Sequence, residues 1–111
     1  MPEYIKTQEE FLKTINEYSN LVVVDFTASW CGPCQDIAPF FDELSAKYTD
    51  VIFIKVDVDE NVETSEVCNV QGMPTFQFYR KGEILDQVVG GDRKKLVESI
   101  EKYRVIKLNM K

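Results

Sequence analysis

The sequence predicts an α/β fold in which helices cover both faces of a mixed β-sheet. Two observations carry this prediction. Apolar, β-branched runs alternate with helical patterns along the first part of the chain, and two strands joined by a short link follow near its end. Helices between successive strands require parallel pairing, whereas a short link gives an antiparallel hairpin. We therefore expect the element order (β)αβαβα followed by ββα, in one domain over residues 1–111.

The first helix is predicted to follow Thr7-Gln8-Glu9-Glu10, which has the form of a capping box, a hydroxyl followed three places later by a carboxylate. The apolar residues after it fall on one helical face, namely Phe11, Leu12, Ile15 and Tyr18. The next run, from Leu21 to Ala28, is apolar on both faces, which is typical of a strand covered by helices on each side.

The middle of the chain predicts a long helix, a strand and a short helix. The long helix runs from Pro33 or Cys34 to Tyr48, and Pro39 inside it predicts a kink because proline lacks a backbone donor. Val51 to Asp57 is a strongly apolar strand, and a short helix is expected around Asn61 to Val67.

The end of the chain predicts a hairpin and a last helix. Thr75–Tyr79 and Ile84–Val89 are the two strands, joined across Arg80-Lys81-Gly82-Glu83. Asp92 is expected to cap a helix whose apolar face carries Leu96, Val97, Ile100 and Tyr103. The segment from Val105 to Lys111 has no clear period, and we expect a loose tail there.

The composition excludes several classes of function. The net charge of −6 argues against nucleic-acid and anionic-membrane surfaces, because both demand clustered Lys and Arg. The N-terminal residues do not resemble a secretory signal, and no apolar run approaches the length of a membrane span. We therefore expect a cytoplasmic protein, in which a close Cys pair is more often redox or metal chemistry than a structural staple.

Cys31 and Cys34 form a Cys-x-x-Cys motif directly after the buried strand and at the start of the long helix. At that position the unpaired amides and the helix dipole favour the Cys31 thiolate, which is the nucleophile in disulfide exchange. Cys34, one helical turn on, would lie deeper and resolve the mixed disulfide. Gly32-Pro33 between them suits a tight entry turn.

Two other interpretations of the motif are open. Half of a zinc site would need a second pair or a histidine, but the chain has no histidine and Cys68 is its only other thiol, so we expect no metal. A structural disulfide would close a loop too small to stabilise the fold much. The redox interpretation is favoured over both.

Asp25 interrupts the strand predicted to be buried on both faces. A buried carboxylate is costly and should titrate abnormally high, so Asp25 is a natural proton acceptor or donor for Cys34. The alternative is a strand-end carboxylate that reaches solvent. Lys55 interrupts the neighbouring strand in the same way, and either moderates Asp25 or faces water. Pro74 stands at the start of a strand, where a simple boundary explains it.

Three separate segments resemble the thioredoxin family. The run Val24 to Cys34 is similar to the family's active-site segment, Met73-Pro74-Thr75-Phe76 to its cis-proline loop, and Val88-Val89-Gly90 to its third substrate-facing loop. The resemblance covers the chain from about Tyr4 to Tyr103. It implies the thioredoxin fold, with a central five-strand mixed sheet flanked by four helices.

The resemblance also implies roles for individual residues. Cys31 would attack the target disulfide and Cys34 would release the product, while Asp25 assists proton transfer at Cys34 with Lys55 nearby. The peptide bond between Met73 and Pro74 would be cis. A flat apolar groove for extended polypeptide would be formed by Trp30, Gly32, Pro33, Met73, Pro74, Val89 and Gly90.

The partners implied by the resemblance are thioredoxin reductase, which draws on NADPH, and disulfide-containing proteins such as peroxiredoxins. No cofactor would be bound to the chain itself. Some eukaryotic relatives link two chains through a cysteine at the position of Gly72, so we expect a monomer here. A general protein-disulfide reductase is the favoured function, and a redox-gated binding subunit without turnover is the alternative.

Two residues depart from the family pattern or lie outside it. Gln35 stands where the family commonly has a basic residue, which removes a positive charge beside the dithiol. Cys68 is expected to be a partly buried small apolar residue, with a regulatory oxidation site as the minority interpretation.

Overall fold

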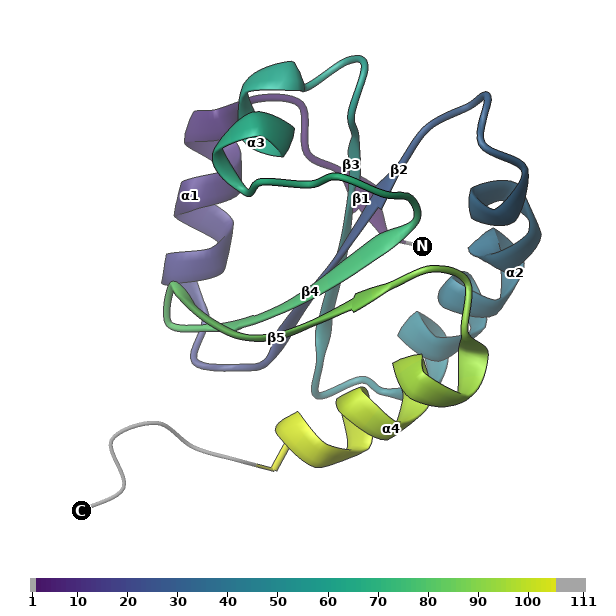
Figure 1. The fold of residues 1–111 in the computed structure, drawn as a ribbon. Coiled ribbons are helices and arrows are strands. Elements are labelled where there is room, and N and C mark those ends of the chain that lie inside the picture. The colour runs from purple at the N-terminus through teal and green to yellow at the C-terminus, as the bar shows by residue number, and fades with distance from the viewer. Residues whose placement is uncertain (1, 106–111) are drawn as a thin grey trace.

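The computed structural model describes residues 2–105 (Figure 1). Its elements follow the expected order, with a short strand first. In chain order they are β1 (Glu3–Tyr4), α1 (Gln8–Glu17), β2 (Val22–Thr27), α2 (Gly32–Lys47), β3 (Ile52–Asp57), α3 (Val62–Val67), β4 (Thr75–Arg80), β5 (Glu83–Val89) and α4 (Arg93–Tyr103).

The five described strands form one mixed sheet in the order β1-β3-β2-β4-β5. β1 and β2 both pair with β3 in parallel, whereas β4 pairs antiparallel with β2 and with β5. The predicted combination of parallel crossovers with a late hairpin is therefore confirmed. β2 lies at the centre of the sheet, which places Asp25 between Lys55 of β3 and Phe76 of β4.

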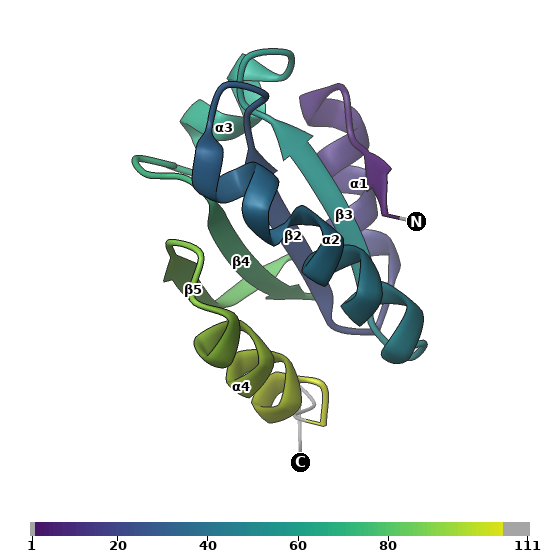
Figure 2. The same ribbon diagram turned by 90° about the vertical axis from the view of Figure 1, so that its right-hand side faces the viewer.

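Helices cover the sheet on both faces. α1 and α3 lie on one side and α2 and α4 on the other, as both views show (Figures 1 and 2). Alternate residues of each strand point to opposite faces, so each strand contributes to two cores. The core under α2 and α4 includes Val23, Phe41 and Phe76, and the core under α1 and α3 includes Phe11 and Val24. This two-sided burial is why β2 is apolar along its whole length.

Local sequence signals account for the starts of the helices. The side chains of Thr7 and Asp92 accept hydrogen bonds from the amides of Glu10 and Lys95, so both predicted caps are confirmed. The carboxylate of Glu10 accepts from the amide of Lys6 rather than from that of Thr7, one residue before the position that a capping box uses.

The structure corrects the predicted apolar face of α1. Phe11 and Ile15 are buried, but Leu12 is 43% exposed, and Tyr18 follows the last helical residue and is 37% exposed. A helix on one face of a sheet buries only a narrow stripe, and Leu12 lies beside that stripe rather than within it.

Three further differences from the expected fold concern the hairpin link, the long helix and the end of the chain. Arg80 and Glu83 were expected in the hairpin link, but Arg80 is the buried last residue of β4 and Glu83 is the first residue of β5. α2 continues through Pro39 to Lys47, and the kink expected there stays a prediction. In the predicted tail, Val105 is exposed and residues 106–111 lie outside the described part of the chain.

Candidate active site

The dithiol lies at the junction between β2 and α2. Cys31 is the N-cap residue of α2, with an extended backbone, and Gly32 and Pro33 open the helix. Cys31 and Cys34 form a disulfide in this structure, with their Cα atoms 5.2 Å apart. Cys31 is 6% exposed and Cys34 is 1% exposed, so Cys31 is the more accessible residue of the two.

The start of α2 favours negative charge on Cys31. The amide of Cys34 donates a hydrogen bond to Cys31 Sγ at 3.2 Å, and the first-turn amides of the helix have no partners within the helix itself. A thiolate formed at Cys31 would therefore meet a donor and the positive end of the helix dipole. The sequence-based expectation about the position of Cys31 is confirmed.

Gln35 closes the loop that leads into the dithiol. Its side-chain amide donates to the carbonyl of Ala28 at 2.9 Å, and the backbone amide of Cys31 donates to the same carbonyl at 3.2 Å. The carbonyl oxygen of Ala28, at the start of this loop, thus accepts hydrogen bonds from both Cys31 and Gln35 at its end. A neutral side chain performs this task here, at the position where a basic residue was the family expectation.

Asp25 lies within the core rather than at the solvent. Its side chain is 2% exposed, and Oδ1 has no hydrogen-bond partner. Burial raises the pKa of Asp25 from 3.8 to about 7, because the charged form loses its hydration; Lys55 lowers this pKa and Asp42 raises it. The interpretation of Asp25 as a solvent-reaching strand-end carboxylate is wrong.

Lys55 is also buried, so the alternative in which it faces water is wrong. It is 8% exposed and stands beside Asp25 in the β2–β3 register. Its ammonium lies 3.5 Å from the carboxylate of Asp42 on α2 and 5.5 Å from the centre of the Tyr4 ring on β1. Sequence reasoning missed Asp42, although its spacing of eight residues from Cys34 places both on one side of the helix.

Two further loops meet the dithiol. The peptide bond between Met73 and Pro74 is cis, as the resemblance implied, and Met73 packs against the buried cluster of Ala28, Cys31 and Cys34. The amide of Gly90 donates to the carbonyl of Pro74 at 2.7 Å. Gly90 adopts a φ of 103°, a conformation that other residues rarely tolerate, so this approach requires glycine.

The surface around the dithiol is apolar and exposed. Trp30 is 68% exposed and Val89 is 57% exposed, whereas Pro74 is buried. The indole Nε1 of Trp30 donates to the carboxylate of Asp59 at 2.7 Å. Asp59 is the second residue that sequence reasoning missed; it comes two places after β3 ends, at the same edge of the sheet as the dithiol.

The sequence model of the family described as Thioredoxin matches residues 3–102. The chain belongs to the thioredoxin family. A thioredoxin of Geodia cydonium is 50% identical over 106 residues, which cover 94% of this chain and 100% of that protein. Thioredoxin H1 of Arabidopsis thaliana is 50% identical over 99 residues, covering 89% of this chain and 87% of the relative.

Solved structures agree with the family. Plasmodium falciparum thioredoxin superposes with a TM-score of 0.88 at 46% identity, covering 91% of this chain and 98% of its own. A chain from a study of the thiol resolving mechanism in yeast mitochondrial 1-Cys peroxiredoxin via glutathione/thioredoxin systems gives a TM-score of 0.87 at 32% identity, covering 91% and 94%. This thioredoxin-family chain is therefore a thiol–disulfide oxidoreductase that reduces protein disulfides through its Cys31–Cys34 pair.

Within residues 2–105, no group of three or more His, Cys, Asp or Glu side chains is arranged to hold a metal ion. No helix in that range is both long and apolar enough to cross a bilayer.

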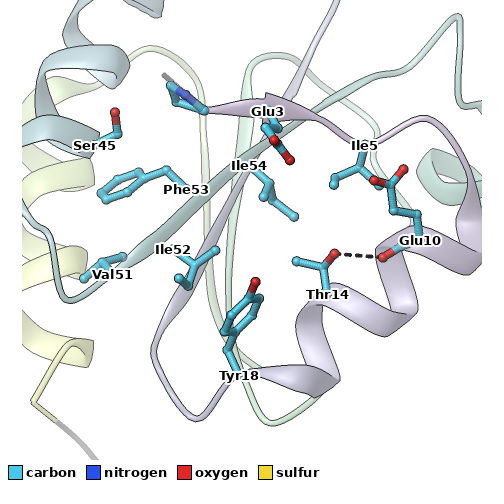
Figure 3. A pocket seen from close by; sticks show the side chains of 11 residues that line it. Glu3, Ile5, Glu10, Thr14, Tyr18, Ser45, Val51, Ile52, Phe53 and Ile54 are labelled. Carbon is cyan, nitrogen blue, oxygen red and sulfur yellow. Dashed lines mark hydrogen bonds between the residues drawn. The ribbon is translucent and has the colours of Figure 1, made fainter.

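A cavity of about 440 Å³ lies at the sheet edge between β1, α1 and β3, and residues such as Glu3, Glu10, Ile52 and Ile54 line it (Figure 3). Neither cysteine of the dithiol lines this cavity.

Proposed function

We propose that Cys31 is the nucleophile of the exchange reaction and Cys34 the resolving thiol. In the reduced protein, the Cys31 thiolate attacks one sulfur of a substrate disulfide. The substrate S–S bond breaks, one substrate thiolate leaves, and a mixed disulfide joins Cys31 to the other sulfur. The N-cap position and the greater exposure of Cys31 support this order of events.

The second step needs a proton acceptor near Cys34. Cys34 gives up its proton, attacks Cys31 Sγ and displaces the second substrate thiolate, which leaves the Cys31–Cys34 disulfide and a substrate reduced by two electrons. Asp25 suits the role of acceptor because its pKa of about 7 allows both protonation states near neutral pH. Lys55 acts on this step through Asp25.

The surface beside the dithiol suits an extended segment of substrate protein. It combines exposed apolar side chains with backbone that a substrate strand could approach, since Gly32 and Gly90 carry no side chain. We assign substrate contact to the residues inferred from the sequence: Trp30, Gly32, Pro33, Met73, Pro74, Val89 and Gly90.

The proposed cycle closes when a separate reductase reduces the Cys31–Cys34 disulfide back to two thiols. The family works with thioredoxin reductase, and we assign NADPH as the source of electrons through that enzyme, with no cofactor held here. The structural relative from the yeast peroxiredoxin study supports peroxiredoxins as one class of substrate. We further assign the protein to the cytoplasm, as a single-domain monomer.

The observation that carries this proposal is the placement of Cys31 at the helix start, one turn before the more deeply buried Cys34. The test is to mix reduced Cys34→Ser protein with a model protein containing a surface disulfide. We expect a stable mixed disulfide on Cys31, identified by mass spectrometry of the digested adduct. Cys31→Ser should form no adduct and should abolish turnover with reductase and NADPH.

Cys68→Ser is the matched control, because it removes a partly buried thiol outside the motif. It should keep full turnover. An adduct on Cys34 or Cys68 in place of Cys31 would overturn the assigned roles. A Cys31/Cys34→Ser double variant that retained the biological function would instead favour a binding subunit.

A further inference from the structure

Three charged side chains share the face of the sheet beneath α2. Val23 belongs to the core under α2, and Asp25, two residues later on the same strand, points to that face as well. Lys55 stands next to Asp25 in the neighbouring strand, and Asp42 comes down from the helix. The face therefore carries two carboxylates and one ammonium.

The Lys55 ammonium is held from the side away from the dithiol. Asp42 lies eight residues after Cys34, which is about 12 Å along the axis of α2. It pairs with Lys55 at 3.5 Å, and the Tyr4 ring lies below the same ammonium at 5.5 Å. Among the described residues, the ion pair of Lys55 is with Asp42 Oδ1. This contact is a charge contact without a hydrogen bond, because Oδ1 of Asp42, like Oδ1 of Asp25, lacks a hydrogen-bond partner within residues 2–105.

We propose that Asp42 is a positioning residue for the buried acid: it holds the Lys55 ammonium toward the far end of α2 and so weakens the attraction between Lys55 and Asp25. The proposal deepens the proposed function and rests on the assignment of Asp25 as the proton acceptor for Cys34. Asp42 itself touches neither the dithiol nor a substrate in this scheme.

The consequence follows from the charges that face Asp25. They are Lys55 from β3 and Asp42 from α2, while β4 contributes the apolar Phe76. The Cys31–Cys34 disulfide at the start of α2 carries no charge in the oxidised protein. An ammonium left free to approach would favour the carboxylate form of Asp25. Burial is the largest cause of the raised pKa of Asp25, and Lys55 opposes it. With Lys55 shared between two carboxylates, the ammonium offsets less of that rise, so Asp25 keeps a proton up to near-neutral pH, where it can exchange that proton with Cys34.

The experiment follows the titration of the Asp25 carboxyl by ¹³C NMR in the oxidised protein. We expect Asp42→Asn to lower the titration midpoint of Asp25 by about one pH unit, because repulsion is lost and Lys55 becomes free to approach. Asp42→Glu keeps the negative charge and should stay within a few tenths of a pH unit of the parent. Glu43→Gln, at an exposed neighbouring position of α2, is the matched control and should leave the midpoint unchanged.

A double-mutant cycle separates positioning from direct repulsion. In a Lys55→Met background, Asp42→Asn should shift Asp25 by less than half of its effect in the parent chain. An unchanged midpoint in Asp42→Asn, or an equal shift in both backgrounds, overturns the proposal. Asp42→Ser serves the same comparison if the amide variant folds poorly, as judged by circular dichroism.

The proposed function is tested separately, by the rate of product release in Asp25→Asn at pH 7. A normal release rate in that variant would remove Asp25 from the reaction while leaving the titration result for Asp42 intact. A slow release rate together with an unchanged midpoint in Asp42→Asn would reject only the inference about Asp42.

Discussion

The indole Nε1 of Trp30 donates a hydrogen bond to the carboxylate of Asp59 at 2.7 Å, and this contact fixes an aromatic side chain that is otherwise 68% exposed. Trp30 comes directly before Cys31 in the sequence, and Asp59 comes from the loop after β3. The hydrogen bond therefore ties two loops together beside the dithiol. A preorganised apolar platform binds a substrate at lower entropic cost than a mobile one.

Asp59→Ala should weaken substrate binding without disturbing the fold. We expect KM for protein disulfides to rise roughly fivefold, the effect of losing one charge-assisted hydrogen bond at an exposed site. Reduction of a small-molecule disulfide should change little. Glu60→Ala removes a neighbouring exposed charge and serves as the control, and an equal rise in KM there would point to net charge instead of the indole contact.

Asp25 should make stability depend on pH. Its pKa is about 7 in the folded chain against 3.8 for the ordinary group, so the folded state binds the proton more tightly. The stabilisation of the folded state by protonated Asp25 is fully present below pH 3.8 and is lost as pH rises to about 7. Asparagine does not ionise, so Asp25→Asn keeps this stabilisation at every pH. Its free energy of unfolding should exceed that of the parent by up to about 4 kcal/mol above pH 8, with little difference near pH 4.

Urea unfolding of the oxidised proteins at both pH values measures this difference. The matched control is Asp36→Asn, which makes the same substitution at an exposed position of α2. If Asp25→Asn changed the free energy of unfolding equally at both pH values, the raised pKa of Asp25 would be refuted.

Two glycines at the site should respond in opposite ways to alanine. Gly90 has a φ of 103°, so Gly90→Ala should cost about 1–2 kcal/mol of unfolding free energy through backbone strain, although no atom lies within 4 Å of an added Cβ. Gly32 has equal space at the start of α2 and no such φ, so Gly32→Ala should be neutral or stabilising by up to about 1 kcal/mol. Thermal unfolding of both variants provides the comparison, and equal losses would contradict it.

Arg80 should be essential for anchoring the end of α4. Its guanidinium donates to the carbonyls of Ser19, Tyr103 and Arg104 at 2.6, 2.8 and 3.2 Å. Arg80→Met should cost about 2–4 kcal/mol because these carbonyls lose their donor. Arg80→Lys should recover little, since an ammonium cannot reproduce the planar fork.

Hydrogen exchange at the last turn of α4 would locate the effect of the Arg80 variants. Faster exchange should be concentrated in this turn, where the helix contributes the carbonyl of Tyr103. A stability loss spread evenly over the sheet, with normal protection in α4, would show that Arg80 acts elsewhere.

Repetitive local patterns explain how much of the fold could be predicted. The apolar strands, the caps at Thr7 and Asp92 and the two cysteines at a helix start are all properties of short windows of sequence. The burial of Asp25 was also predictable, because a side chain in the middle of a strand that helices cover on both faces is buried whichever face it points to. The prediction that Leu12 lies on the buried face of α1 was wrong, because apolarity alone does not show how wide a stripe of the helix the sheet covers.

The sequence by itself determined the order of strands and helices and the dithiol at the start of α2, because dihedral preference, periodicity and capping act over a few residues. Only the tertiary structure decided which distant side chains share a charge or a hydrogen bond. The pairs Lys55–Asp42 and Trp30–Asp59 and the Arg80 anchor join positions 13, 29 and up to 61 residues apart. Such contacts depend on the register and packing of whole elements, and no short window of sequence encodes that arrangement.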